Sequence, residues 1–93
     1  MTEVITLPRL IGSRESIAEI FSQLPDDLSE QKVILDYSDN VAASQGSVDE
    51  TFKQIMVDRN ASLLVCRSIS ERAKKHLLRA SELREHSGEL IFE

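Results

Sequence analysis

Two serines, Ser44 and Ser47, lie on either side of Gly46 where a polar loop changes to an amphipathic pattern. The pattern predicts that a helix begins here, and the first turn of a helix carries unpaired backbone N–H groups and a partial positive charge. Such a helix start suits an anion or a phosphorylated hydroxyl. Serine is also among the residues most strongly preferred as a helix cap, so both side chains have a structural role open to them.

Other polar residues extend this candidate site. Those close to the two serines, or at the end of the next predicted strand, are candidates for contacts with a partner or an anion: Asp36, Ser38, Gln45, Gly46, Asp49, Arg67 and Ser68. A phosphate on either serine would add roughly −1.5 to −2 charges. We expect Asp49 to oppose that charge and Arg67 to offset it.

The remaining chemically active side chains do not form a recognisable catalytic or metal site. Cys66 could serve as a nucleophile with His76 or His86 as its base, or it could be a small apolar residue at a strand end. The two histidines are ten residues apart, with no further ligand at zinc spacing. Asp36 and Asp39 lack the spacing of a calcium-binding loop, and aspartates after strands commonly accept turn N–H groups. The sequence therefore predicts no metal, no cofactor and no catalytic residue.

Composition predicts one small globular domain spanning residues 1–93. Apolar residues make up 41% of the chain, charged residues 29%, and the formal net charge is −5. The basic residues are scattered, and those on the third predicted helix are broken up by glutamates and lack interleaved aromatics. We therefore expect neither nucleic-acid nor membrane binding. The first ten residues do not resemble a signal peptide, no run could span a bilayer, and the single cysteine fits a reducing compartment, which together predict a cytoplasmic protein.

Hydrophobic patterning predicts the elements that position these residues. Short apolar runs predict strands over residues 4–7, 33–35, 62–66 and 89–92. The first predicted helix is capped by Ser13 and stopped by Pro25; the second begins at Gly46 or Ser47. The third begins with the capping-box pattern S-x-x-E over residues 68–71. The apolar stripes of the three helices are expected at Ile17, Ile20, Phe21 and Leu24; at Val48, Phe52, Ile55 and Met56; and at Ala73, Leu77, Ala80 and Leu83.

The order β-α-β-α-β-α-β predicts an α/β domain with a mainly parallel or mixed sheet of about four strands packed with helices. The continuous run Val33–Leu35 is typical of a strand covered on both faces. If the second and third strands are parallel neighbours, the loops 38–47 and 67–70 meet at the carboxyl edge of the sheet. Ligands and partners of open α/β sheets bind at that edge. Arg67 is then expected to face the serine-bearing helix start.

Three segments carry a family likeness: Ile11–Glu15 (IGSRE), Val33–Tyr37 (VILDY) and Ser44–Glu50 (SQGSVDE). Their order and spacing resemble the STAS-like family of unassigned function found in bacteria and archaea. That family is related in fold to the STAS domains of sulphate transporters and anti-sigma-factor antagonists. The resemblance covers most of the chain and implies a single STAS-like domain.

In anti-sigma-factor antagonists this loop carries a D-S-S-G-like motif whose serine is phosphorylated by a partner kinase. Aligning Gly46 with that glycine places Ser44 at the phosphoacceptor position, with Ser47 as a second candidate. Ala43 stands where the motif has its aspartate. The resemblance implies a non-enzymatic regulatory interaction module whose partner is an anti-sigma-type kinase or related ATPase, which would supply ATP and magnesium.

Two other functions are compatible with the same residues. One is a site for a small anion or a nucleotide at the same sheet edge. The other is a structural subunit that forms a homodimer through an exposed edge strand.

Overall fold

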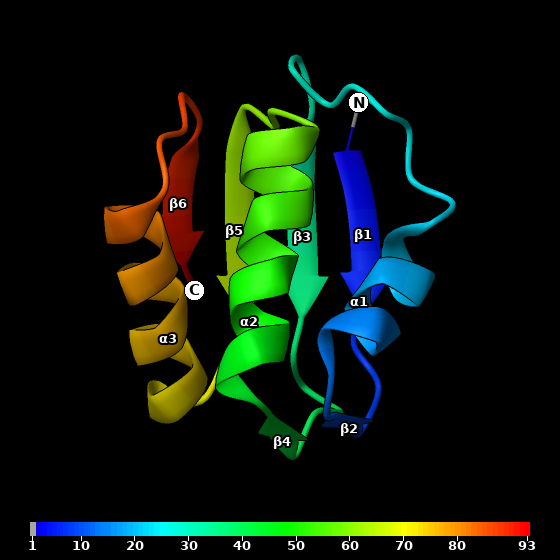
Figure 1. Cartoon of the computed structure of the whole chain (residues 1–93), viewed down its shortest axis with the longest axis vertical. Helices are drawn as coiled ribbons and strands as arrows, with labels where there is room; N and C mark the ends of the chain where they lie inside the picture. Colours follow the sequence, from blue (N-terminus) through cyan, green and yellow to red (C-terminus); the bar gives the residue numbers. More distant parts are fainter. Residues whose placement is uncertain (1) are drawn as a thin grey trace.

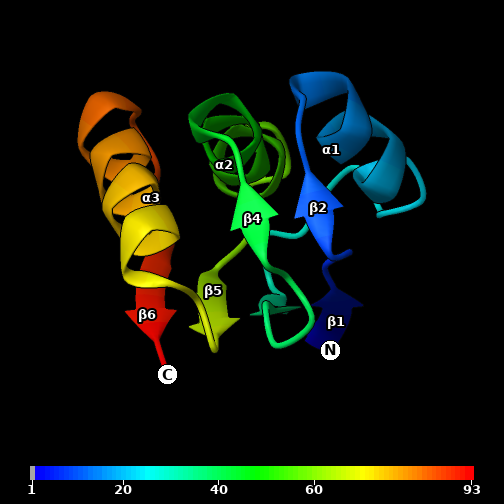
Figure 2. The same cartoon turned by 90° about the horizontal axis from the view of Figure 1, so that it is seen from below.

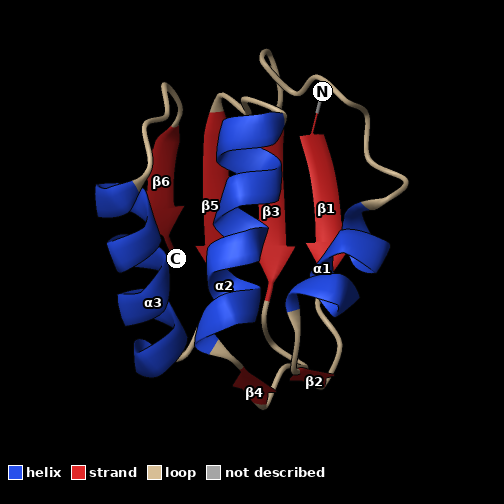
Figure 3. Cartoon of the chain, in the orientation of Figure 1, coloured by secondary structure: helices blue, strands red, loops and turns tan. Residues whose placement is uncertain are grey.

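The computed structural model describes residues 2–93 and shows a small α/β fold (Figures 1 and 3). Four parallel strands form the main sheet in the order β1-β3-β5-β6: β1 (Thr2–Thr6), β3 (Lys32–Asp36), β5 (Leu63–Arg67) and β6 (Glu89–Phe92). Three helices connect them: α1 (Arg14–Phe21), α2 (Gln45–Phe52) and α3 (Glu71–Leu83). The predicted α/β class, the four strands and their alternation with helices are confirmed.

All three helices cover the same face of the sheet (Figure 2). Each helical connection joins a strand to its neighbour in the sheet, always in the same direction from β1 to β6. Because such crossovers are right-handed, all the helices come to lie on one side of the sheet. Val33 and Leu35 point into the core beneath the helices, whereas Ile34 lies outside that core cluster. Ile34 is nevertheless buried, so the predicted burial of β3 on both faces is confirmed, but helices cover only one of these faces. A continuous apolar run does not reveal what covers each face.

The hydrophobic core lies between the sheet and the helices and contains the predicted stripes. Phe21 of α1, Phe52 of α2 and Leu77 of α3 are all completely buried. Leu83 was expected to point inward, and this is wrong. It is the last residue of α3, is exposed, and lines a cleft between α2 and α3 instead of reaching the sheet.

The sequence pattern missed two features. A second, two-stranded parallel sheet pairs β2 (Leu10–Ile11) with β4 (Ala42–Ala43), in segments expected to be loop. In addition, α2 continues as a π-helical segment, η1 (Lys53–Asp58). Strands of two residues are too short to show a period of two, so local pattern could not identify them.

Candidate functional site

The candidate site lies at the carboxyl edge of the main sheet, where β2, β4 and the starts of the three helices come together (Figures 1 and 2). The Tyr37 N–H donates to the Arg67 carbonyl oxygen at 2.9 Å, which ties the end of β3 to the end of β5. Val41 and Ser70 line one small hollow from the two following loops. The prediction that loops 38–47 and 67–70 are neighbours is confirmed.

Each helix begins with a serine that caps it. The side-chain oxygens of Ser13, Ser44 and Ser70 each accept a backbone N–H from three residues further on, all at 3.1 Å. Helix α2 therefore begins at Gln45, and Ser44 has a real capping role. The capping box predicted from Ser68 is wrong. Ser68 has a left-handed φ of 59° and lies outside α3, because the cap falls two residues later.

The two candidate phosphoacceptors differ sharply in their surroundings. Ser47 is 0% exposed, and its hydroxyl lies 2.8 Å from the Ser44 carbonyl oxygen and 3.3 Å from that of Ile11. A kinase cannot reach this hydroxyl in the folded protein, so its burial argues against Ser47 as the phosphoacceptor. Ser44 is half-buried and lines a surface hollow of about 430 Å³, which it shares with Arg72. Of the two candidates, Ser44 is the more accessible.

Arg67 does not face the start of α2, contrary to expectation. Along β5 it alternates with the core residues Leu64 and Cys66, so its side chain lies on the face of the sheet without helices. There its Nε donates to a carboxylate oxygen of Glu93 at 3.0 Å. The arginine that shares a hollow with Ser44 is Arg72, near the start of α3.

Asp36 has a structural role at the end of β3. Its carboxylate accepts the Ser38 N–H at 2.9 Å, and this backbone hydrogen bond is the main reason why the pKa of Asp36 is lowered. Asp36 is also the register partner of Arg67, on the face without helices. Asp36 and Ser38 therefore shape the turn after β3 rather than line the hollow beside Ser44.

Two apolar side chains project at the tip of this edge. Leu10 of β2 and Val41, just before β4, are each 67% exposed. The Val41 N–H donates to the carbonyl oxygen of Arg9 at 2.8 Å, and the Ser44 N–H donates to that of Ile11 at 3.0 Å. These bonds place Leu10 and Val41, which we call the apolar tip, on paired segments that lead into α1 and α2. Leu10 pairs in register with Ala42, the neighbour of Val41, so the two exposed side chains come from adjacent segments of the same edge.

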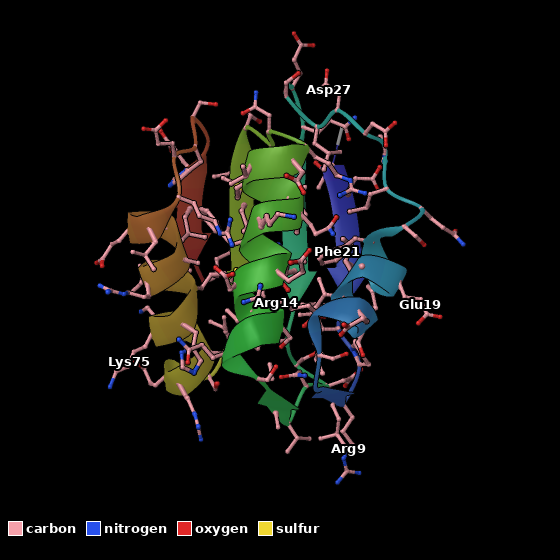
Figure 4. All side chains as sticks on the ribbon, viewed as in Figure 1. Arg9, Arg14, Glu19, Phe21, Asp27 and Lys75 are labelled. Atoms are coloured by element: carbon pink, nitrogen blue, oxygen red, sulfur yellow. The ribbon has the colours of Figure 1, made fainter. Side chains whose placement is uncertain are left out.

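On the other side of the α2 start, a cleft of about 550 Å³ separates α2 from α3. Gln45 and Gly46 contribute to its wall together with three arginines that the sequence did not indicate, Arg14, Arg79 and Arg84, and with His76, which was a candidate only as a base for Cys66. Figure 4 shows Arg14 in front of α2, between the flanking helices. These residues come from α1, from α3 and from the segment just after α3, so no local spacing could have united them.

Asp49 is the acidic centre of this cleft. Arg84 donates to both of its carboxylate oxygens, at 3.1 and 2.8 Å, and Arg14 donates to one of them at 2.9 Å. The Arg84 hydrogen bonds are the main reason why the pKa of Asp49 falls to about 2. Asp49 is therefore ionised at neutral pH and already paired with two guanidinium groups. It opposes a nearby phosphate less than the sequence suggested.

The thiol and the histidines form no catalytic pair. Cys66 is buried, and burial raises the pKa of its thiol to about 12, so it is neither ionised nor accessible. His86 packs edge-on against Phe52, with ring centroids 4.9 Å apart, while His76 lines the α2–α3 cleft. Over residues 2–93, no three histidine, cysteine, aspartate or glutamate side chains gather as metal ligands would.

None of the helices in residues 2–93 combines the length and apolar character needed to cross a bilayer. The chain matches no protein-family model, and neither the curated proteins nor the solved structures contain a significant match to it.

Proposed function

We propose that this chain is a non-enzymatic regulatory interaction module with a STAS-like fold, and that it binds a protein partner through the carboxyl edge of its sheet. The observation that carries this proposal is the apolar tip, because Leu10 and Val41 are each 67% exposed on paired segments that lead into α1 and α2, respectively. The phosphoacceptor candidate Ser44 follows β4 immediately. A partner that covers the tip would also meet Ser44.

We propose Ser44 as the switch of this surface. Its hydroxyl borders the open hollow that contains Arg72, and it lies at the positive end of α2. A phosphate there would add roughly −1.5 to −2 charges beside an apolar contact surface. Arg72 offers a nearby cation, and Asp49 is occupied by Arg84 and Arg14. Phosphorylation is expected to weaken a mainly apolar contact with the tip.

The proposed partner is an anti-sigma-type kinase or a related ATPase, as the sequence resemblance implies. Such an enzyme brings its own ATP and magnesium. The chain itself then needs only an accessible hydroxyl and a docking surface, and the candidates for these at the carboxyl edge are Ser44 and the apolar tip.

The test compares two serines with the same capping role. The variants Ser44→Ala and Ser70→Ala each remove a cap with the same 3.1 Å hydrogen bond, so each is expected to lose about 1 kcal/mol of stability. Wild type and both variants are incubated with anti-sigma-type kinases from the source cells, and phosphopeptides are mapped by mass spectrometry. We expect phosphate on Ser44 in wild type and in Ser70→Ala, and none in Ser44→Ala.

Kinase binding is measured on the same proteins. Leu10→Asp with Val41→Asp is expected to weaken binding at least tenfold, which is about 1.4 kcal/mol, whereas Leu83→Asp, on an exposed side chain of α3, is expected to retain it. Modification that persists in Ser44→Ala would refute the switch. Equal binding by the tip variant and wild type would refute the docking surface.

A second function is favoured by the cleft between α2 and α3. Three arginines and one histidine line this cleft in a chain whose net charge is −5, which suits a small anion such as inorganic phosphate or a nucleotide. Asp49 is the competing anion that any ligand must displace from Arg14 or Arg84. Within residues 2–93, the only ion-pair partner of Arg79 is the exposed Glu82, at 3.6 Å, and Arg79 is the most exposed of the three cleft arginines.

Thermal denaturation with inorganic phosphate and with ATP tests this second function. A bound ligand stabilises the folded state by about 2.7 kcal/mol when its concentration is one hundred times Kd. We expect a saturable rise in Tm that is lost in Arg79→Ala with Arg14→Ala and kept in Arg67→Ala, because Arg67 lies on the opposite face of the sheet. A rise of equal size in all of these proteins would exclude the cleft as the site.

A further inference from the structure

The face of the main sheet opposite the helices carries no covering layer within residues 2–93 (Figure 2). This is unusual, because fully parallel sheets generally have both faces covered. The strand register aligns four β-branched side chains in one row across the middle of this face: Val4, Ile34, Val65 and Ile91. We call this set the central row.

The central row is shielded in the middle and open at its ends. Ile34 and Val65, on the two inner strands, are 6% and 2% exposed because they are enclosed by their neighbours. Val4 and Ile91, on the edge strands, are 62% and 41% exposed. β-branched side chains have few rotamers, so the row is a stiff and nearly flat apolar surface. A flat partner could cover Val4 and Ile91, at the two ends of the central row, without moving Ile34 and Val65 in its middle.

Charged residues lie on either side of the central row. Towards the carboxyl ends of the strands, Asp36 of β3 is the register partner of Arg67 of β5, and Arg67 also contacts Glu93. Towards the amino ends, Lys32 of β3 is the register partner of Leu63, and Leu63 is in turn the partner of Glu89. Asp36 on β3 and Arg67 on β5, one acidic and one basic, therefore occupy equivalent positions on the two inner strands.

This charge pattern is complementary to itself. A twofold axis that runs parallel to the strands between β3 and β5 would place a second copy of the face with its β5 opposite β3. Asp36 of each copy would then lie opposite Arg67 of the other, so two ion pairs would form by symmetry. Within the central row, Ile34 would meet Val65 and Val4 would meet Ile91. No like charges oppose one another in this arrangement.

The other simple twofold arrangement is less favourable. An axis that runs across the strands would pair Lys32 of one copy with Asp36 of the other, but it would also place Glu89 opposite Glu93. Opposed like charges cost energy. Each axis brings one basic side chain against Leu63, Lys32 for the parallel axis and Arg67 for this one, so that contact does not separate the two arrangements. The charge pattern therefore favours the axis parallel to the strands, which opposes no like charges.

The face of the sheet is small. Its four strands are four or five residues long. At a strand spacing of about 4.8 Å and a rise of about 3.3 Å per residue, they cover roughly 300 Å². This is well below the ~800 Å² that each partner buries in an interface of standard size, so we expect a weak dimer. Two sheets that pack face to face lie about 10 Å apart with their strands within about 30° of alignment.

We propose that the helix-free face binds a second copy of this chain, forming a symmetric dimer in which the central rows pack together and Asp36 pairs with Arg67 across the twofold axis. This contact uses neither the apolar tip nor the α2–α3 cleft. The dimer contains two carboxyl edges, one from each protomer, and both edges remain free to bind a partner. It differs from the sequence-based expectation of a dimer through an edge strand, because the strands pack face to face.

The first test is the mass in solution across a dilution series from about 500 μM to about 1 μM, a range that covers micromolar Kd values. Ile91→Lys is expected to raise the dimer Kd at least tenfold. Leu78→Lys is the matched control, because Leu78 on α3 is also 41% exposed and lies on the helical side. A monomeric wild type at every concentration, or equal effects of the two substitutions, would overturn the proposal.

A charge exchange tests the orientation of the two copies. Asp36→Arg and Arg67→Asp, each alone, place like charges across the axis and are expected to weaken association. The double variant restores opposite charges and is expected to recover the dimer, with circular dichroism confirming that all three proteins are folded. Failure of the double variant to recover, in a folded protein, would reject this axis. The variant with both tip residues changed to aspartate is expected to dimerise like wild type, which separates this proposal from the tip surface.

Discussion

Replacing Ser47 by aspartate is expected to unfold the protein, whereas the same replacement at Ser44 is expected to leave it folded. Ser47 is 0% exposed, and its side chain faces the carbonyl oxygens of Ser44 and Ile11. A carboxylate there would be desolvated and would meet acceptors instead of donors. Such a buried, unpaired charge costs several kcal/mol, which is comparable with the roughly 5–15 kcal/mol that stabilises a whole domain.

The outcome at Ser44 is the reverse because aspartate is as good a helix cap as serine. Its carboxylate can accept the Ser47 N–H that Ser44 now accepts, and its charge complements the helix dipole. Urea denaturation followed by circular dichroism measures both variants, with Ser70→Asp as a second cap replacement. If Ser47→Asp unfolds within about 1 kcal/mol of wild type, the surroundings of Ser47 are open, and it returns as a candidate phosphoacceptor.

The second large effect is expected at Gly88, just before β6. A Cβ atom on this residue would lie 2.1 Å from the Ala61 carbonyl oxygen, 2.8 Å from the Met56 methyl group and 3.1 Å from the Ser62 carbonyl oxygen. Two of these neighbours are backbone atoms that hold the start of β5, so they cannot simply rotate away. The Glu89 N–H also donates to the Ser62 carbonyl oxygen at 3.0 Å, and the clash would pull this bond apart.

Gly88→Ala is therefore expected to lower the free energy of unfolding by about 3 kcal/mol or more, which is at the upper end of the losses caused by overpacking. The substitution is also expected to loosen β6 from the sheet. Gly12→Ala is the matched control. A Cβ at Gly12 meets nothing within 4 Å, and its φ is not positive, so this variant is expected to be neutral or slightly stabilised. Chemical denaturation of both variants measures the difference. Equal stability would show that the approach of residues 61–62 to Gly88 is looser than the structure indicates.

Local sequence patterns determined which segments form the main strands and helices. Ile17 and Phe21 on α1, and Leu77 on α3, occupy the core positions that their helical spacing predicts. The cap at Ser13 and the strand before the C-terminus also follow from neighbouring residues alone. These features depend on contacts within one helical turn or one strand, so a window of a few residues contains the information.

Local pattern failed where two equivalent signals competed or where the element was very short. Both Ser68 and Ser70 offer a cap for α3, and the left-handed backbone at Ser68 decides between them. The pairing of β2 with β4 depends on hydrogen bonds between segments about thirty residues apart. Neither feature leaves a periodic signal in the sequence.

Only the tertiary structure decided which of the candidate residues meet. Arg67 is the last residue of β5, at the edge where its expected role required it, yet strand alternation places its side chain on the helix-free face. Asp49 forms an ion pair with Arg84, which lies thirty-five residues further along the chain. Ser47 is buried against the segment that contains Ile11. The sequence by itself determined an α/β domain with a serine at the start of its second helix. The single-sided helical layer, the open sheet face and the partners of each charge follow from the direction of the crossovers, which depends on long-range packing and not on any local period.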